Sequence, residues 1–389
     1  MVTCNPSHIL LIDVNASWMR SLMMALPGVR EGATRLHAWQ VYGSRYWLAN
    51  RSRISAAKSD QTGLVEDVVA VPGWTRLSRL STAVLSWKVK RFLRRFGPPA
   101  VIIYTLPQYA GVAAKFANCF QVYYAHDAYR FYDAWDPVRI GELENQILNS
   151  CDLIFAVSRQ LQADFQKLTA KPVLYSPNAV SATLVSQLAL PSIEKPPELR
   201  SLPDKVVGCV GQISESAYDW PLIGGLASAL PEFTFVFIGP LADHSPESLA
   251  RVKRVLRLPN VRWLGPRPHA ELGRYFAAFD ICFGPYAVTP LKQRGSPLRM
   301  YDYLCTSKPI LFTPISEICH HHEYVEVGGT VEECVGLIRK MASSDYPMDL
   351  AARRRFLLEN TWEKRAEQFW SRVGECRRAF APDKIALVS

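Results

Sequence analysis

Polar and charged side chains with the spacing of a diphosphate site stand in the segment 285–309. Ser296-Pro297 is typical of a helix start, with Ser as the N-cap and Pro at the first helical position. The free N–H groups at this helix mouth, over Ser296–Leu298, would attract an anion, and Arg299 adds a fork for phosphate oxygens. Asp302 lies one turn deeper, where its carboxylate could accept from the two hydroxyls of a ribose. The pattern predicts a nucleoside-diphosphate site. The alternative is an Arg299–Asp302 surface pair on an ordinary capped helix.

A candidate general base ends an apolar run in the first half of the chain. Asp127 follows the expected strand Gln121–His126, and it is the first acid after the acid-free stretch Val68–His126. Such a positive neighbourhood would keep the carboxylate ionised, and a carboxylate can deprotonate a hydroxyl. We rank Asp127 first and His126 second. The alternative is a carboxylate that caps the following turn or pairs with Arg130.

The elements that would position these groups are short apolar strands separated by helical stretches. Such strands indicate parallel sheets covered on both faces, and ligands of such sheets bind beyond the carboxyl ends of the strands. The expected strands of the first half are His8–Val14, Val68–Val71, Ala100–Leu106, Gln121–His126, Leu153–Val157 and Val173–Tyr175. Those of the second half are Lys205–Val210, Phe233–Ile238, Val261–Leu264, Asp280–Phe283 and Ile310–Phe312.

The fold class predicted is α/β, with two Rossmann-like, doubly wound domains that face a cleft. The first domain would span 1–190 and the second 205–358, with a proline-rich linker at 191–204 and a C-terminal helix at 359–389 that crosses back to the first domain. No G-x-G-x-x-G follows the first expected strand and no P-loop pattern is present, so we expect no cofactor.

Two further clusters of ionisable residues are given structural interpretations. Glu142 and Glu144 stand two residues apart on one expected helix and are interpreted as surface charges. The run Cys319–Glu323 contains three adjacent histidines, whose side chains point in different directions, and no second cluster has matching spacing. We interpret it as a solvated loop and predict no metal site.

A basic amphipathic stretch spans Leu85–Phe96. Its apolar residues cover an arc of about 100° on a helix, and the basic residues cover the opposite side, with Trp87 among them. This arrangement suits lipid headgroups, although a domain helix with a solvated basic face has the same pattern. Nucleic acid is a rival ligand, but no recognised nucleic-acid module accompanies the charge. The predicted membrane and acceptor contacts are Trp87, Lys88, Lys90, Arg91, Arg94 and Arg95.

Composition limits the class of protein. The chain has 389 residues, 49% of them hydrophobic, which excludes disorder as the main description. Its 45 Lys and Arg against 35 Asp and Glu give a net charge of +10, and all of this excess lies in residues 1–126. Acidic partners should therefore meet the N-terminal half. Nine cysteines without a C-x-x-C pair, and apolar runs too short to span a membrane, favour a cytoplasmic protein.

The segment 285–309 resembles the donor-site signature of GT-B glycosyltransferases of the bacterial group 1, or family-4-like, clan. Arg299 and Asp302 stand where Lys and Glu are usual, Ser307 replaces a Gly, and Arg294 replaces the first Glu of an E-x7-E pair. Resemblance also covers the segments around Gly208–Gln212, Leu230–Pro240, Leu258–Gly265, Phe279–Tyr286, Cys151–Ser158 and Ser176–Asn178. The matching positions of the signature are Ser296, Pro297, Leu298, Arg299, Tyr301, Asp302, Tyr303, Leu304, Lys308 and Pro309.

This resemblance implies a sugar transferase that needs no bound metal ion. It would use a nucleotide-sugar donor, UDP rather than GDP, and a lipid-linked saccharide acceptor, in exopolysaccharide, capsule or lipopolysaccharide synthesis on the inner face of the cell membrane. Gly211 and Gln212 would bring backbone close to the donor, and Tyr286 would line the sugar pocket. In similar xanthan-type glucuronosyltransferases the base occupies the strand end where Asp127 lies, whereas in retaining relatives a residue here contacts the donor sugar, so the stereochemistry stays open. The alternatives are a GT-B epimerase and a non-catalytic saccharide- or lipid-binding protein.

Overall fold

The chain divides into two compact units. The computed structural model describes residues 7–13, 19, 22–23, 25, 34–55, 64–74, 77–188, 194–200, 202, 205–243 and 245–380. Unit 1 consists of Met1–Pro177 with Trp362–Ser389, and unit 2 of Asn178–Thr361. The linker expected at 191–204 falls within unit 2 by this division, and part of it lies outside the described residues, so it stays a prediction. The chain passes between the units twice, after Pro177 and after Thr361. The segments next to these two points lie side by side, because the N–H of Val180 donates to the carbonyl of Asn360 at 3.0 Å.

Unit 1 is built on a parallel sheet. Within the described residues it has seven strands in the order β3-β2-β1-β4-β5-β6-β7, and every pair is parallel. Because chain order runs outward from β1 in both directions, the sheet has its topological switch point between β1 and β4. The strands are β1 (Ser7–Ile12), β2 (Thr34–Gly43), β3 (Leu64–Val71), β4 (Val101–Tyr104), β5 (Gln121–Ala125), β6 (Leu153–Ala156) and β7 (Val173–Tyr175).

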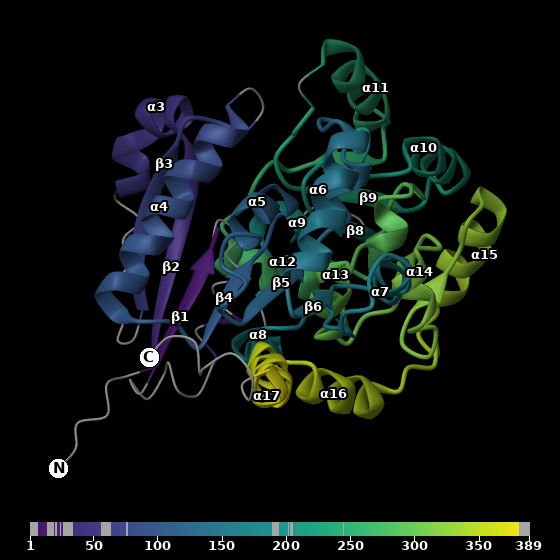
Figure 1. Cartoon of the computed structure of the whole chain (residues 1–389). Coiled ribbons are helices and arrows are strands. Elements are labelled where there is room, and N and C mark those ends of the chain that lie inside the picture. Colours follow the sequence, from purple (N-terminus) through teal and green to yellow (C-terminus); the bar gives the residue numbers. More distant parts are fainter. Residues whose placement is uncertain are drawn as a thin grey trace. The chain divides into compact units, whose positions relative to one another are not determined.

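Helices pack against this sheet (Figure 1). The basic helix α4 contacts β3 at the edge of the sheet. The C-terminal helix α17 belongs to unit 1, and its Phe369 lies 4.7 Å from Phe155 of β6 and 5.9 Å from Tyr124 of β5, between ring centroids. The helices are α3 (Ser44–Ser55), α4 (Ser78–Phe96), η1 (Pro107–Tyr109), α5 (Ala110–Ala113), η2 (Tyr129–Phe131), α6 (Pro137–Ser150), α7 (Arg159–Gln166) and α17 (Trp362–Phe380).

Unit 2 repeats the design with a shorter sheet. Its described part has six parallel strands in the order β10-β9-β8-β11-β12-β13, with the switch point between β8 and β11. Two buried clusters of apolar side chains cover the two faces of this sheet. The strands are β8 (Val206–Val210), β9 (Thr234–Ile238), β10 (Val261–Trp263), β11 (Ile281–Gly284), β12 (Ile310–Phe312) and β13 (Glu326–Val327).

Side-chain caps fix where several helices of unit 2 begin. Asp219, Ser245 and Asp349 each accept a backbone N–H at a helix start, and Thr330 and Glu333 form a capping box. The helices are α8 (Ala182–Leu188), α9 (Pro197–Arg200), α10 (Trp220–Ala229), α11 (Pro246–Leu256), η3 (His269–Glu271), α12 (Leu272–Ala278), η4 (Lys292–Arg294), α13 (Leu298–Leu304), α14 (Ser316–Cys319), α15 (Val331–Met341) and α16 (Leu350–Glu359).

The predicted fold class is confirmed: each unit is a doubly wound α/β sheet. Every expected strand overlaps an observed one, with ends that differ by a few residues. Two strands, β2 and β13, are not predicted. The segment Thr34–Gly43 mixes Arg, His and Gln with aromatic residues, so it has neither the continuous apolar run nor the alternation that marks a strand. No helix in the described parts of the chain is long and apolar enough to cross a membrane.

Candidate functional site

The switch point of unit 2 gathers the residues predicted to bind the donor. Gly211 and Gln212 follow directly after β8, and Tyr286 lies two residues after the end of β11, so all three stand at the carboxyl edge of the sheet. The two loops are joined: the N–H of Asp219 donates to the carbonyl of Pro285 at 2.8 Å. Because ligands of doubly wound sheets bind at this position, the geometry is that of a binding edge.

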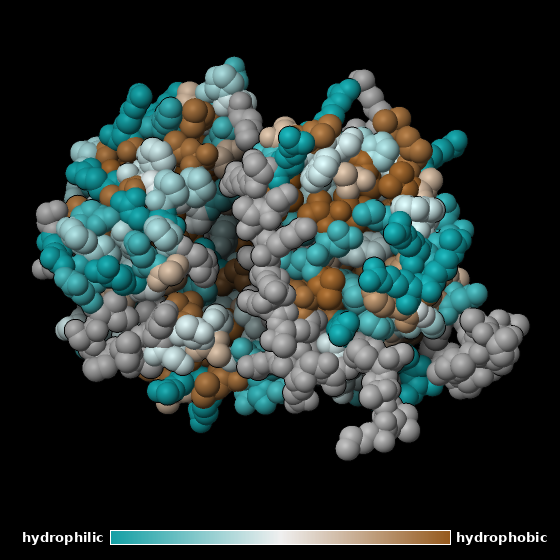
Figure 2. Space-filling model, turned by 90° about the vertical axis from the view of Figure 1, so that its left-hand side faces the viewer, coloured by the Kyte–Doolittle hydropathy of each residue, from teal (hydrophilic) through white to brown (hydrophobic). Residues whose placement is uncertain are grey.

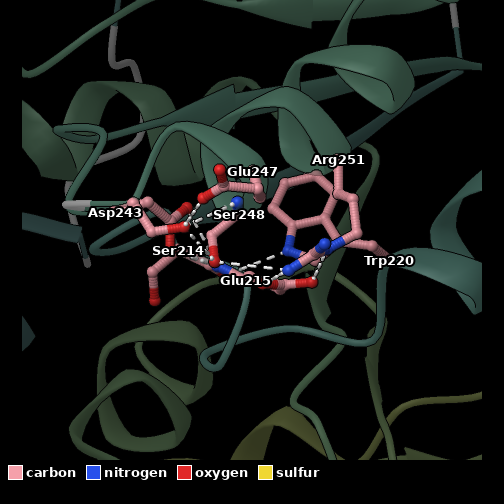
Figure 3. A network of polar contacts seen from close by, with 8 residues as sticks. Ser214, Glu215, Trp220, Asp243, Glu247, Ser248 and Arg251 are labelled. Carbon is pink, nitrogen blue, oxygen red and sulfur yellow. Dashed lines mark hydrogen bonds and ion pairs between the residues drawn. The ribbon is translucent and has the colours of Figure 1, made fainter.

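The loop after β8 is held from its outer side by a polar network (Figure 3). The N–H of Glu215 donates to both carboxylate oxygens of Asp243, at 3.0 and 3.1 Å, and Trp220 donates from Nε1 to the carbonyl of Ser214 at 2.9 Å. Arg251 of α11 pairs with the side chain of Glu215, and this hydrogen bond lowers the pKa of Glu215 to about 2. The network is not predictable from the sequence, because its members lie in three separate segments whose polar residues form no recognisable motif.

Gly211 lies where there is no room for a side chain. A Cβ on Gly211 would stand 2.4 Å from the hydroxyl of Tyr218, and one on Gly239 would stand 1.7 Å from the carbonyl oxygen of Gly211. Gly239 also has a φ of 146°, which favours glycine. The space next to Gly211 is therefore filled by Tyr218 and Gly239 of the protein itself. Gln212, in contrast, is exposed.

Tyr286 is half-buried and packed between rings. Its ring stacks on Tyr218 with centroids 5.8 Å apart, and its carbonyl accepts from the hydroxyl of Thr313 at 2.7 Å. Burial raises the pKa of Tyr286, and the nearby charge of Arg299 partly opposes this. The phenol is therefore a neutral hydrogen-bonding group close to α13, the helix predicted to bind the donor and called the donor helix below.

Arg299 and Asp302 form the ion pair that the spacing allows. Nη1 of Arg299 lies 2.7 Å from Oδ2 of Asp302, and the two side chains are 18% and 19% exposed. The guanidinium also lies over the ring of Phe276, 5.3 Å from its centroid. The pKa of Arg299 is raised: burial disfavours the charged form, but Asp302 and the nearby tyrosine side chains together outweigh it. Nη1 carries the one hydrogen bond that Arg299 makes with described residues, so its other donors can reach a ligand.

The predicted N-cap is wrong. Pro297 occupies the N-cap position of α13, which has seven residues, and no side chain caps the helix. Ser296 is buried, and its Oγ instead accepts from the N–H of Asn178 at 3.1 Å, while Nδ2 of Asn178 donates to the carbonyl of Ser296. Proline at N-cap fixes the backbone, so the hydroxyl of Ser296 is used to anchor the segment rather than to cap the helix.

Tyr303 fixes α13 over the switch point, a role that sequence reasoning does not assign. Its buried hydroxyl accepts from the N–H of Val210 at 3.0 Å, at the end of β8, and donates to the carbonyl of Phe283 at 3.2 Å, in β11. A buried Tyr needs a partner for its hydroxyl, and here that need ties the donor helix to both strands of the binding edge.

In unit 1 the candidate base also stands at a carboxyl edge. Asp127 lies two residues after the end of β5, and both of its carboxylate oxygens accept hydrogen bonds. Oδ1 accepts from the N–H of Ala128 at 2.9 Å and Oδ2 from the hydroxyl of Tyr132 at 2.5 Å. These donors orient the carboxylate and stabilise its ionised form. Asp127 thus makes the turn contact of the alternative interpretation, but not the contact with Arg130.

Arg130 pairs with Glu144, which corrects the interpretation of Glu144 as a surface charge. Nε of Arg130 lies 2.7 Å from Oε2 of Glu144, whose side chain is only 1% exposed. Burial raises the pKa of Glu144, and Arg130 partly opposes the shift. Glu142 is exposed, as expected. The pair joins η2, which directly follows the candidate base, to α6.

His126, the second candidate base, lies against Tyr129. The hydroxyl of Tyr129 stands 2.6 Å from Nε2 of His126. Burial lowers the pKa of His126 to about 4, and a hydrogen bond with the backbone of Tyr124 opposes this. The imidazole is therefore neutral at neutral pH and a weak proton acceptor, which favours Asp127 for the role.

Asp13 is a buried carboxylate that the sequence analysis does not select. It follows β1 at the switch point of unit 1, and its φ of 73° is uncommon for a residue other than glycine. The hydroxyl of Tyr109 donates to its Oδ2 at 2.8 Å, and the hydroxyl of Thr105 donates to its carbonyl at 3.0 Å. A lone Asp after an apolar strand is a weak signal, whereas its backbone conformation is visible in the structure alone.

Known proteins resemble this chain in sequence over one part and in structure over nearly all of it. The sequence profile of Glycosyltransferase Family 4 matches residues 41–184. A Bacillus subtilis (strain 168) protein named as a teichuronic acid biosynthesis glycosyltransferase, TuaH, is 32% identical over 126 residues, which are 31% of each chain. The chain thus matches about a third of the length of this curated relative.

Solved structures of GT-B proteins superpose on almost the whole chain. OtsA in its apo form gives a TM-score of 0.71 at 11% identity, over 94% of this chain and 99% of its own. Sucrose-phosphate synthase from Thermosynechococcus elongatus gives 0.69 at 14% identity, over 96% and 99%. This chain has the GT-B fold. The GT-B fold that the donor-motif resemblance implies is thereby confirmed, and the family 4 match over residues 41–184 agrees with that resemblance. Anabaena HepE, solved in complex with UDP and glucose, gives 0.61 at 15% identity, over 98% and 100%.

The histidine run of this GT-B protein is only partly solvated. His320 and His322 are exposed, but His321 is buried and lies edge-on to Phe356, with ring centroids 5.2 Å apart. Across the described residues, no three His, Cys, Asp or Glu side chains are grouped so as to hold a metal ion.

The basic helix α4 presents its charges as its periodicity predicts. Leu85, Val89 and Phe92 are buried against the sheet, whereas Trp87 is 54% exposed. Lys88 lies 3.9 Å from Asp67 of β3. Lys90, Arg91, Arg94 and Arg95 are exposed.

Proposed function

We propose that this protein is a glycosyltransferase that moves a sugar from a UDP-sugar to a hydroxyl of a lipid-linked saccharide. One observation carries the proposal: Arg299 and Asp302 form a partly buried pair on a helix that Tyr303 anchors at the switch point of unit 2. The family 4 match in unit 1 and the GT-B relatives support it. UDP is chosen because HepE, with the same fold, is solved with UDP and glucose.

Each donor residue has a proposed role that follows from its chemistry. Arg299 would hold the diphosphate through the nitrogen atoms not used by Asp302, since a guanidinium forks onto phosphate oxygens. Asp302 would accept from the ribose, and Tyr286 would line the sugar pocket. The backbone at Gly211 and Gln212 and the segment Ser296–Leu298 would border the donor.

Asp127 is proposed as the base that takes the proton of the acceptor hydroxyl. Its two hydrogen-bond donors keep the carboxylate ionised and oriented. As the charge moves to the leaving diphosphate, Arg299 would stabilise it. No metal ion has a role in this proposal.

The acceptor and the setting are proposed from the charge of unit 1. The second half of helix α4 carries exposed Trp87 and five basic residues, a composition that suits an anionic membrane surface. We therefore place the protein on the cytoplasmic face of the cell membrane, in the assembly of a bacterial surface polysaccharide.

The test uses the full-length protein, radiolabelled UDP- and GDP-sugars, and a membrane lipid extract. Label that enters lipid only when extract is present supports transfer. An altered sugar without extract points to epimerisation instead. If no donor reacts and neither UDP nor GDP raises the thermal midpoint, the nucleotide-sugar proposal is wrong, and binding without reaction would favour a non-catalytic role.

A further inference from the structure

A cavity of about 490 Å³ lies within unit 1, between α4 and the strands β2 and β3. Its floor is aromatic and buried, formed by His37, Trp39 and Phe92, with the rings of Trp39 and Phe92 edge-on at 6.1 Å. Burial lowers the pKa of His37 to about 4, helped by nearby positive charges, so the floor is neutral at neutral pH. Trp87 and Phe96 stand at its rim.

The cavity lies at the edge of the sheet opposite to the proposed base. Its strand residues come from the first six residues of β2 and the first half of β3, and its helix residues from the second half of α4, which ends where the chain turns into β4. These are amino ends of strands, whereas Asp127 follows the carboxyl end of β5. A ligand here would not be the group that reacts, so the cavity requires its own explanation.

Three guanidiniums line the cavity, and no ion pair with a described residue neutralises their charges. Arg35, Arg91 and Arg95 line it, and none of them forms an ion pair with a described residue. Arg91 lies over the ring of Trp87 at 5.8 Å and Arg95 over Phe96 at 5.0 Å. Like charges brought together at a concave surface raise the local potential and favour an anion.

Acidic side chains at the same cavity leave the balance positive. Glu66 and Asp67 line it, and Asp67 lies 3.9 Å from Lys88, a fourth basic residue of the lining. The four cations therefore exceed the two carboxylates. Arg35 comes from a strand and the other cations from α4, so the charge converges from two elements rather than lying along one helix face.

The geometry points to a binding site for the phosphate headgroup of an anionic membrane lipid, with the guanidiniums on the phosphate and the apolar rim against the first carbons of the chains. Guanidiniums fork onto phosphate, and Trp is favoured at the level of headgroups. Two apolar side chains of the lining are themselves exposed and would face the same membrane, Val65 of β3 and Trp87 of α4.

Surface composition on this side agrees with a lipid rather than a soluble anion. Figure 2 views the side on which α3, β3 and α4 lie in Figure 1, and hydrophobic residues are interspersed there with hydrophilic ones. A soluble anion would need only the charge. The aromatic floor and the apolar rim add recognition of a group that carries hydrocarbon. This site deepens the membrane placement proposed above and rests on it, and it fixes the protein on a surface without touching the donor.

The experiment compares two double variants with equal loss of charge. Arg35→Gln with Arg91→Gln removes two cations of the cavity, and Arg51→Gln with Lys115→Gln removes two exposed cations of unit 1 that lie outside its lining. Co-sedimentation is measured with vesicles of phosphatidylcholine alone and with added phosphatidylglycerol, at raised salt, where exposed charges are screened. We expect the cavity variant to lose binding to the anionic vesicles by about tenfold or more, and the outer variant to change by about twofold or less.

Several results would overturn the site. Equal losses for both variants would mean diffuse charge attraction. Inorganic phosphate that binds without vesicles as tightly as the vesicles do, and only to the parent, would mean a soluble ligand. A dimer in gel filtration that the cavity variant alone dissolves would mean that a second copy occupies the cavity. Unchanged thermal midpoints and UDP binding show that the variants are folded. Because UDP binding belongs to unit 2, its failure would refute the proposed function without touching this site.

Discussion

Replacing Arg299 with Gln tests the donor site most directly. Nη1 of Arg299 is bonded to Asp302 at 2.7 Å, and no described residue occupies its other nitrogen atoms. If these form two charge-assisted hydrogen bonds to the diphosphate, each contributes about 1.5–3 kcal/mol. Taking the lower value for both gives about 3 kcal/mol, or a rise of about 100-fold in the Kd for UDP.

Arg299→Lys separates charge from fork geometry. Lys keeps the positive charge, and it is the usual residue at this position of the signature that the segment resembles. We expect UDP binding to weaken by only about tenfold, because a point charge replaces two parallel hydrogen bonds. Isothermal titration calorimetry of UDP measures both variants, and the thermal midpoint reports whether the fold is intact.

The control is Arg339→Gln on α15, which removes one exposed cation and should leave the Kd unchanged. Asp302→Asn, alone and with Arg299→Gln, shows how much of the loss comes from leaving Asp302 unpaired. A Kd for Arg299→Gln within about threefold of the parent would refute the assignment, since this equals less than 1 kcal/mol. The pair would then be the surface pair of the alternative interpretation.

Four further outcomes are expected. Asp127→Asn should keep UDP binding and thermal stability but lower transfer by about a hundredfold or more, and retained transfer would exclude it as the base. Glu144→Gln leaves a partly buried guanidinium unpaired and should cost about 2 kcal/mol in chemical unfolding, against no change for the exposed Glu142→Gln. Gly208→Ala places a Cβ about 2.2 Å from the ring of Phe279 and should destabilise unit 2 by about 3 kcal/mol, seen in the same assay. Because the pKa of His37 is lowered to about 4 in the folded protein, the unfolded chain binds more protons between about pH 6.5 and 4. The free energy of unfolding should therefore fall as the pH falls through this window, by up to about 3 kcal/mol, and a flat stability profile would contradict the burial of His37.

Most of the fold follows from strand-sized apolar runs, and its failures have a physical cause. Buried parallel strands are apolar on both faces, so β4, β5, β9 and β12 are visible in the sequence. The missed strand β2 is different. Its His37 and Gln40 are buried polar residues, and polar letters interrupt the pattern even though the backbone is fully paired. A single sequence cannot show that a buried His lies against another His, as His37 does with His8 at 2.9 Å.

At the candidate site, too, the sequence predicts where residues lie in the fold but not which partners they contact. Placement at carboxyl edges follows from the strand order, and it puts Asp127 and the donor helix where sequence reasoning expects them. Partners across long stretches of chain do not follow. Ser296 fits a cap on local grounds, but Asn178, which is 118 residues away, takes its hydroxyl. From the sequence alone Glu144 is consistent with a surface charge, but in the structure it is buried and paired with Arg130.

The two units carry positive charge in different ways, and each way suits a different kind of anion. In unit 1 many basic side chains are exposed, above all on α4, where salt screens long-range attraction and only a shaped site can be selective. Unit 2 places one cation, Arg299, at a binding edge, less than a fifth exposed and against the ring of Phe276. Salt screens a partly buried charge much less, so a single guanidinium there can attract an anion more strongly than several exposed ones. The net charge of +10 therefore says little about the donor. It describes unit 1, whereas the proposed recognition of the nucleotide would depend on Arg299 and Asp302, a pair that contributes nothing to the net charge.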